Sequence, residues 1–561
     1  MTICTKIRAT LRRRLRDERG FTMLLALFVL VITTLILSGA YLAVLSDTHL
    51  SRNDLDQKRA YAGAQAGIQA YNYQLNQNEN YWQTCTPLGT ASSPITVPGS
   101  TDQGGGSESY YVTPLPASTA PASDPKCDSS NALATMIEGS SGAGSASGSF
   151  RIQSVGTSGN VSRTIVAQYK PPSFLNYVYY TDYETLDPSV TGDPASCEVH
   201  YPNRGSQCGG NSAPYGSIDF INGDTINGPL HTEDTLAICG NPVFGRPGAG
   251  DAIEAAAATG APNGWYQDGC SGTPTFNTAT GKVNTAATSI TPPSTNTSLL
   301  SVAQSGGYVY TGATTIVLTN NTMSVTSPGT TNATNHPTGT NVPFPSNGVI
   351  YVSTVSSAGC GVSYTPFNPS YTNDGNCGNA YVSGTYTQSL TIATDNDIII
   401  DGNICTTTTT TCSGAPTTNA LLGLIADYFV RIYHPVDGTR QSSSGNCSSG
   451  ARGAQDVTND SGSLTNPTIY AAILAVSHSF IVDNYDCGSP LGTLTVYGAI
   501  AQLYRGTVGT QDNGNVASGY VKSYNYDDRL QNEEPPYFLD PVSAQWYVSR
   551  ETECAASSSS C

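Results

Sequence analysis

The sequence predicts an α+β protein: a long N-terminal helix and a small antiparallel β unit, followed by a large all-β domain with disulfide-clipped loops. Three observations lead to this prediction. Residues 21–45 form a run of 25 residues without a charge. Apolar residues then recur at helical spacing as far as residue 75. Beyond residue 109, short apolar runs alternate with Gly, Asn and Asp turns, as is typical of strands.

Composition narrows the functional classes. The chain has 561 residues, 12% of them charged, and a net charge of −17. Its 38% hydrophobic residues and 33 Tyr are enough to form a sizeable core, which argues against disorder. Seven of the 24 basic side chains lie in the N-terminal segment 1–20, so the remainder is strongly acidic. An acidic body repels phosphate backbones, which argues against nucleic-acid binding by bulk charge.

The apolar run 21–45 predicts a membrane-spanning helix. Its length as a helix would be about 38 Å, and the hydrocarbon core of a bilayer is about 30 Å thick. The basic leader 1–20 is therefore expected in the cytoplasm. The run is too long for the apolar region of a cleaved secretory signal. A plain single-pass anchor fits the hydropathy equally well.

An apolar stripe extends the predicted helix to about residue 80. Its members are separated by three or four residues, as on one face of an α-helix. They are Tyr61, Ala64, Ile68, Tyr71 and Leu75. A coiled-coil stalk is the alternative, but only two heptads are present. We therefore expect the second half of this helix, over 21–80, to pack on a β-sheet.

The junction Arg19-Gly20-Phe21-Thr22 resembles the prepilin-peptidase site of type IV pilins and of type II secretion pseudopilins. The resemblance implies cleavage after Gly20, with Phe21 as the first residue of the mature chain. The segment RAYAGAQAGIQ (59–69) is similar to PilX-type pilus-assembly proteins. Membership of that family would imply a membrane precursor whose partners are other pilins, the pilus assembly machinery and prepilin peptidase.

Leu25 departs from the family pattern. Major pilins carry Glu at the fifth residue after the cut, where that carboxylate is understood to neutralise the α-amino group of a neighbouring subunit. A charge in hydrocarbon is tolerated only when it is paired. A subunit with Leu25 cannot form that pair, which implies a minor subunit at a unique filament position.

Two regions follow the helix. Residues 81–170 form the predicted pilin-like β unit, with strands at 109–113 and a hairpin over 149–169 that alternates apolar and polar residues. Residues 171–550 form the predicted extracytoplasmic β-rich domain, with a Thr/Asn-rich loop insert at about 247–345. Residues 551–561 are expected to be a C-terminal tail.

Three segments of the outer domain align with one another. Each has a small-residue start, a polar position and a three-residue strand, and they cover 392–402, 424–434 and 475–485. The offsets between them are 32 and 51 residues. Such spacing predicts the rungs of an irregular β-solenoid or a layered sheet, with inserts that leave the stack.

Fifteen cysteines indicate an oxidising compartment. Cys4 lies in the leader, and the other fourteen form an even set. Sequence does not determine connectivity, but pairing of neighbours leaves every bridge local. The expected pairs are Cys85–Cys127, Cys197–Cys208, Cys239–Cys270, Cys360–Cys377, Cys405–Cys412, Cys447–Cys487 and Cys554–Cys561.

Few residues suggest catalysis or metal binding, and no Walker, Rossmann or HExxH motif is present. Alternation places Asp395, Asp397 and Asp401 on one face, as a Ca²⁺ site would require, although solvated aspartates are the favoured interpretation. Residues 527–529 with 533–534 could supply general acid/base groups, but structural ion pairs are favoured. We expect no cofactor and no enzymatic activity.

The sequence therefore predicts a minor type IV pilin-like subunit that primes or caps pilus assembly and displays an adhesive or receptive outer domain. It would cross the cytoplasmic membrane once, with its N-terminus in the cytoplasm, and then reach the pilus or cell surface. One alternative is an extracellular DNA- or surface-binding receptor of the uptake machinery, since Tyr-rich surfaces suit binding. Another is a membrane-anchored, polysaccharide-acting β-helix enzyme.

Overall fold

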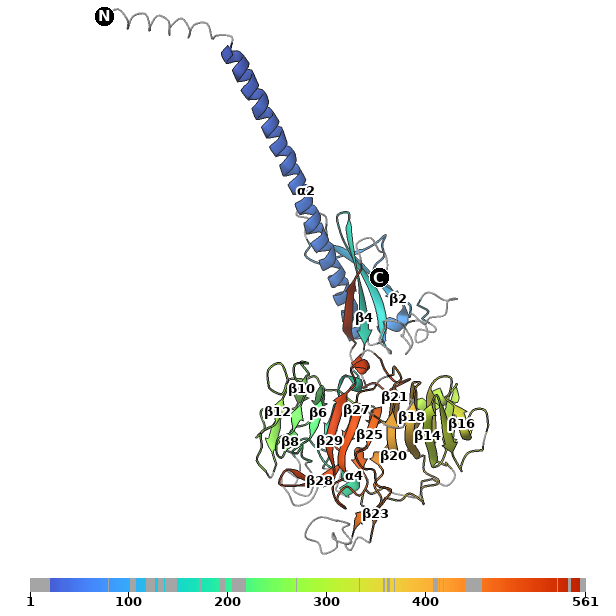
Figure 1. Cartoon of the computed structure of the whole chain (residues 1–561). Helices are drawn as coiled ribbons and strands as arrows, with labels where there is room; N and C mark the ends of the chain where they lie inside the picture. The colour runs from blue at the N-terminus through green and yellow to red at the C-terminus, as the bar shows by residue number, and fades with distance from the viewer. Residues whose placement is uncertain are drawn as a thin grey trace, which may run out of the picture.

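The computed structural model describes residues 21–554 with internal gaps. The gaps are 79, 101–106, 118–126, 130–135, 137–148, 171–172, 192–196, 204–217, 269, 332, 357–358, 361–363, 368, 407–411, 413, 417, 439–456, 532 and 543–545. The described chain consists of a long helix, a five-stranded sheet against its second half, and a β-rich outer domain (Figure 1).

The helix α2 (Phe21–Gln77) is continuous over 57 residues. Its segment Thr22–Leu42 has a mean hydropathy of 2.5 and lies outside the protein core, so its length and composition suffice to cross a membrane. The second half is buried along Ala60, Ala64, Ile68, Tyr71 and Leu75. The predicted stripe was wrong at its first position: the Tyr61 side chain is 41% exposed, and Ala60 faces the sheet instead.

The sheet that covers the helix is antiparallel throughout. Its strands, in spatial order, are β1 (Ile95–Thr96), β2 (Ser109–Leu115), β3 (Phe150–Ser158), β4 (Val161–Lys170) and β30 (Tyr547–Glu553). β3 and β4 form the predicted hairpin. β30 comes from the end of the chain and pairs Tyr547 with Lys170. The boundary expected at residue 550 therefore falls inside a strand of this sheet.

Helix and sheet approach each other closely because small residues lie between them. A Cβ atom at Gly156 of β3 would lie 2.0 Å from the carbonyl oxygen of Ala60. The hydroxyl of Ser154 donates to the Ala64 carbonyl at 2.7 Å, and that of Tyr169 donates to the Ile68 carbonyl at 3.2 Å. These contacts fix the rotation of α2 on the sheet.

The outer domain is inserted between β4 and β30 and consists mainly of parallel strands. One row runs through β13 (Tyr308–Thr311), β17 (Val349–Ser353), β19 (Leu390–Thr394), β21 (Leu422–Ala426), β25 (Thr468–Ala475), β27 (Gly492–Tyr504), β5 (Tyr179–Tyr183), β7 (Leu230–Thr232) and β10 (Ile253–Ala255). A second runs through β14 (Thr314–Asn320), β18 (Ala380–Tyr386), β20 (Ile398–Cys405), β22 (Val430–Ile432) and β26 (Phe480–Val482). A third runs from β27 through β29 (Asn515–Tyr526), β6 (Thr225–Asn227) and β9 (Val243–Phe244) to β12 (Thr275–Phe276).

Short elements complete the fold. The helical ones are η1 (Tyr81–Thr84), η2 (Phe174–Asn176), α4 (Pro188–Thr191), α5 (Ser298–Gln304) and η4 (Asp528–Gln531). The remaining strands are β8 (Leu236–Ile238), β11 (Trp265–Gln267), β15 (Thr322–Thr326), β16 (Gly339–Pro343), β23 (Val436–Asp437), β24 (Thr458–Asn459) and β28 (Gly509–Asp512).

The chain does not run through the rows from one end to the other. It starts in the middle, where β5 pairs with β27, and extends outward to β10. It then crosses to the far end at β13 and returns strand by strand to β27 and β29. In Figure 1 the green strands lie at one end, the olive ones at the other and the orange ones between them. The first and last strands of the domain are therefore close together.

The shorter of the two predicted offsets is confirmed, because Ile392 of β19 pairs with Leu424 of β21. The predicted offset of 51 is wrong. Ala426 pairs with Ala475, an offset of 49, and Val430 pairs with Phe480, an offset of 50. The two values differ because the corner after β25 is one residue longer than the corner after β21.

The expected loop insert at 247–345 contributes strands to the core instead. It contains β10 to β16, and Ile253, Tyr310 and Ile316 within it are buried. Its Thr- and Asn-rich composition hides an alternating pattern, since every second residue of β14 from Thr314 to Leu318 points inward. Polar residues on the outward face make such a strand resemble a loop.

The insertion predicts that the helix-and-sheet unit folds without the outer domain. Replacing residues 171–545 with Gly-Asn-Gly would join the paired strands β4 and β30 by a short connection. The replacement keeps Trp546, whose ring packs on that of Phe150 with 4.8 Å between the ring centroids. We expect native-like far-UV circular dichroism and cooperative unfolding in detergent. A matched chain that ends at Trp546, and so lacks β30, should lose cooperativity; equal behaviour of the two would contradict the closing role of β30.

Candidate functional site

The first half of α2 is the most distinctive surface of the chain. Its large apolar side chains are exposed, and the exposed fraction of Leu25 is 54%. An apolar surface of this extent requires a membrane or other apolar helices around it. Gly20 of the predicted cleavage site lies outside the described residues, and Phe21 is the first residue of α2.

A buried charge cluster lies where the outer domain joins the sheet; we call Lys170, Ser173, Glu534 and Asp540 the neck cluster. Lys170 is fully buried, and its Nζ lies 3.1 Å from Glu534 Oε1. Burial raises the pKa of Glu534, although the charge of Lys170 opposes this. Burial, and next the charge of Glu534, raise the pKa of Asp540 well above its usual value.

The sequence predicts a functional role for only one charged member of the neck cluster. It predicts Glu534 as a possible acid/base group but gives no role to Lys170. The available signal was a lysine at the end of an amphipathic strand, followed directly by two prolines. A lysine at such a strand end is usually solvated, and its burial here results from the return of residues 531–542, which no local pattern reveals.

The candidate acid/base residues at 527–529 form separate ion pairs. Arg529 Nε donates to Asp527 at 2.9 Å, and the same guanidinium donates to the Thr418 and Ala420 carbonyls. Asp528 is 66% exposed and pairs instead with Arg246 at 2.7 Å. These contacts fit the structural interpretation favoured for this segment.

The three aspartates considered for Ca²⁺ have different environments. Asp395 accepts from the Tyr351 hydroxyl at 2.6 Å. Asp397 is buried and pairs with Arg431 at 3.1 Å. Asp401 Oδ1 has no hydrogen-bond partner among the described residues, and burial raises the pKa of its carboxyl. Within the described part of the chain, no three His, Cys, Asp or Glu residues come together as a metal site.

Arg431 holds an insert against the parallel strands. Its guanidinium makes two contacts with Asp483, at 3.0 and 3.1 Å, and one with Asp397. The hydroxyls of Tyr364 and Tyr371 donate to the two oxygens of Asp483 at 2.7 and 2.8 Å. Both tyrosines belong to the loop that the Cys360–Cys377 disulfide closes. The buried cation therefore attaches this loop to the core.

The disulfides follow the local pattern where they are described. Four expected bridges are present, Cys85–Cys127, Cys239–Cys270, Cys360–Cys377 and Cys405–Cys412, with Cα–Cα distances of 4.4–5.5 Å. Cys197, Cys487 and Cys554 are also disulfide-bonded. Their expected partners, Cys208, Cys447 and Cys561, lie outside the described residues.

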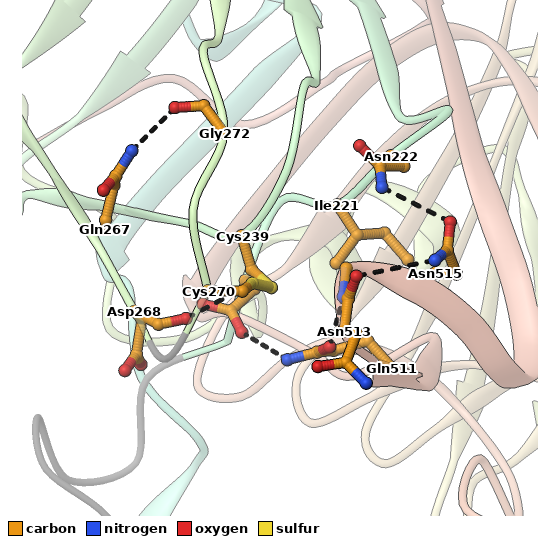
Figure 2. Close-up of a disulfide and its surroundings, with 12 residues drawn as sticks. Ile221, Asn222, Cys239, Gln267, Asp268, Cys270, Gly272, Gln511, Asn513 and Asn515 are labelled. Atoms are coloured by element: carbon orange, nitrogen blue, oxygen red, sulfur yellow. Dashed lines mark hydrogen bonds between the residues drawn. A yellow bond between two sulfur atoms is a disulfide. The ribbon is translucent and has the colours of Figure 1, made fainter.

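Figure 2 shows how the Cys239–Cys270 bridge is placed. It connects the ends of β8 and β11, and Gln267 donates across the same loop to the Gly272 carbonyl at 2.6 Å. Nearby, Asn222 donates to Asn515 at 3.3 Å and joins this loop region to β29. Burial, and next the charge of Asp219, raise the pKa of Asp268 to about 6. The bridge thus closes a polar corner of the domain.

A polar pocket of about 410 Å³ lies at the β13 end of the outer domain. Its lining includes Gln304, Thr311, Thr330 and His336. Among the described residues, no carboxylate and no lysine lines it, and the side chains of Gln304, Thr311, Thr330 and His336 supply hydrogen-bonding groups.

Removal of the buried Arg431 cation tests its structural role. We expect Arg431→Met to destabilise the outer domain by about 3–5 kcal/mol, because Asp397 and Asp483 remain buried without their cation. The difference in stability between the variant and the wild type should become smaller at acid pH, where protonation of the carboxylates removes their unpaired charge. Denaturant unfolding measures both effects. The exposed Lys282→Met removes the same charge and should change stability by less than about 0.5 kcal/mol, so a similar loss in both variants would contradict this role.

Comparison with known proteins gives a coarse likeness. No protein-family model and no curated protein matches the chain. Among solved structures, the chain is similar to the competence-associated pilin ComZ from Thermus thermophilus, at 12% identity and a TM-score of 0.30. The alignment covers 89% of this chain and 97% of that chain.

Proposed function

We propose that this chain is a minor, pilin-like subunit that is held in a membrane by α2, primes or caps a filament, and displays the outer domain. The observation that carries the proposal is the continuity of α2. One unbroken helix has an exposed apolar half, Thr22–Leu42, and a second half buried on an antiparallel sheet. A subunit that moves from a bilayer into a bundle of helices needs this division.

Burial of the exposed apolar half of α2 would stabilise the subunit both in a lipid bilayer and in a bundle of neighbouring helices. Each large apolar side chain that leaves water contributes about 1.5–3 kcal/mol, whether lipid or a neighbouring helix covers it. Leu24, Leu27 and Phe28 are each more than 60% exposed. In the second half of α2, in contrast, the apolar stripe is already buried against the antiparallel sheet of the same chain.

A terminal position is supported by two features. Leu25 lacks the carboxylate that would pair with the α-amino group of a neighbour. The outer domain lies beyond the end of the sheet farthest from the apolar half, and it is broader than the helix-and-sheet unit (Figure 1). Such a domain would obstruct another subunit placed beyond it, whereas at a filament end it is free to contact a surface.

Processing at Gly20 tests the first part of the proposal. In cells with an active prepilin peptidase, mass spectrometry of the membrane-extracted protein should identify Phe21 as the first residue. Gly20→Leu should abolish cleavage, because the substitution adds bulk at the scissile junction. Gly39→Ala, where a Cβ meets nothing within 4 Å, is the matched control and should be processed normally. A wild-type chain that retains Met1 would contradict processing.

The position of the subunit is tested through Leu25. Leu25→Glu places a carboxylate in the bilayer at a cost of about 2.5–3.5 kcal/mol, which only a neighbouring α-amino group would offset. We expect fewer filaments than wild type, with immunogold label confined to filament ends. Leu24→Gln adds polarity without a charge and should have a smaller effect. Label along the whole shaft, or more filaments with Leu25→Glu, would show that the subunit repeats.

A further inference from the structure

The neck cluster brings together groups that are seldom buried with one another. Lys170 ends β4, and its Nζ lies 3.1 Å from Glu534 Oε1 and donates to the Gln531 carbonyl at 3.3 Å. Both partners are excluded from solvent, with side-chain exposures of 0% and 6%. Asp540 is a second carboxyl whose charge would act on both. Its Oδ1 is buried and accepts no hydrogen bond from the described residues.

We propose that Lys170 and Glu534 form an intramolecular amide bond, with Asp540 transferring the protons. The neutral Nζ attacks Cδ of the protonated Glu534 carboxyl, and the new C–N bond forms. Asp540 takes a proton from the attacking nitrogen and gives it to the departing hydroxyl. The C–O bond breaks, and one water leaves. No oxidant or external reactant is required.

The surroundings favour the protonated form of the two carboxyls, which this step needs at Glu534. A carboxyl and an amine in contact can exchange a proton to become a neutral acid and a neutral amine. Burial raises the pKa of both Glu534 and Asp540. The site also has a second carboxyl, Asp540, beside the amine and the Glu534 carboxyl, and it can pass a proton to the leaving hydroxyl. Groups held in contact react as if at roughly 10⁵–10⁸ M, and exclusion of water opposes hydrolysis.

A second buried lysine provides an internal comparison. Lys522 Nζ lies 2.7 Å from Asp224 Oδ2. That carboxylate also accepts the backbone N–H groups of Ile221 and of Lys522 itself, each at 2.9 Å. Hydrogen bonds to a carboxylate favour its charged form, which is a poor electrophile. Among the described residues, no backbone N–H donates to the carboxyl of Glu534, so the Lys170–Glu534 pair meets this requirement for condensation and the Lys522–Asp224 pair does not.

The bond would change how the outer domain is held. The domain is connected to the sheet through Lys170 on one side and through the return segment 531–546 on the other. A bond between Lys170 and Glu534 joins the return segment directly to β4. Tension on the outer domain would then pass into β4 through covalent bonds, and the hydrogen bonds of β30 would carry none of it.

Mass spectrometry of the full chain, extracted in detergent, reduced and alkylated, tests the proposal. The intact mass should be lower than that of the processed sequence by one water, and peptide mapping should yield a branched peptide that joins Lys170 to Glu534. Lys170→Arg keeps the charge but removes the amine, so the water loss and the branch should disappear. Lys522→Arg is the matched control and should retain both.

Peptide mapping of the wild-type chain is decisive even where Lys170→Arg disturbs the buried site. Separate, unbranched peptides containing Lys170 and Glu534 in a folded chain would overturn the proposal. A branch from Lys170 to Asp540 would overturn the assignment of Glu534 as the acceptor. Asp540→Asn should slow bond formation by about 100-fold or more, and an unchanged rate would overturn its role in proton transfer.

Discussion

The pairing of β30 with β4 is the contact on which the arrangement of the chain depends. Because Tyr547 pairs with Lys170, the last strand of the sheet comes from beyond the outer domain. The outer domain is therefore an insertion with two connections rather than a terminal appendage with one. Trp546 reinforces the closure, since it packs on Phe150 and Trp82 in the core beneath α2. Two connections restrict the orientation of the domain far more than one flexible linker would.

Inside the outer domain, a few buried charges take positions that apolar residues could occupy. Arg431, Arg505 and Lys522 each contact a buried carboxylate, and an aromatic ring lies next to each cation. Buried ion pairs add little net stability, but the loss of one partner is costly, so they favour one arrangement over others. Short strands with similar apolar sequences can shift their register easily. Fixed charge pairs between particular strands penalise such shifts.

The helix and the β3–β4 hairpin could be predicted because each is set by a local pattern. Four disulfides match the expectation that cysteines neighbouring in sequence pair, although sequence alone did not determine their connectivity. The closing role of residues 547–553 could not be predicted, because this mostly polar and exposed segment has no regular apolar alternation, and the expected boundary divides it between the outer domain and the tail. The strands within 247–345 were hidden by polar outward faces. Lys170 was missed for a similar reason, since its partners Gln531 and Glu534 come after almost the whole outer domain in the sequence.

The position of β30 also sets the order in which the protein can mature. The residues of α2 are synthesised first, and the residues that complete the sheet are synthesised last. The outer domain imposes the same order, because β5, its first strand, needs β27, which lies near the end of its sequence. Contacts between distant segments form slowly. The five-stranded sheet is therefore complete only after the whole outer domain has been synthesised. A truncated chain would lack the edge strand β30 and leave the outer edge of β4 unpaired, so the topology itself distinguishes full-length chains from truncated ones.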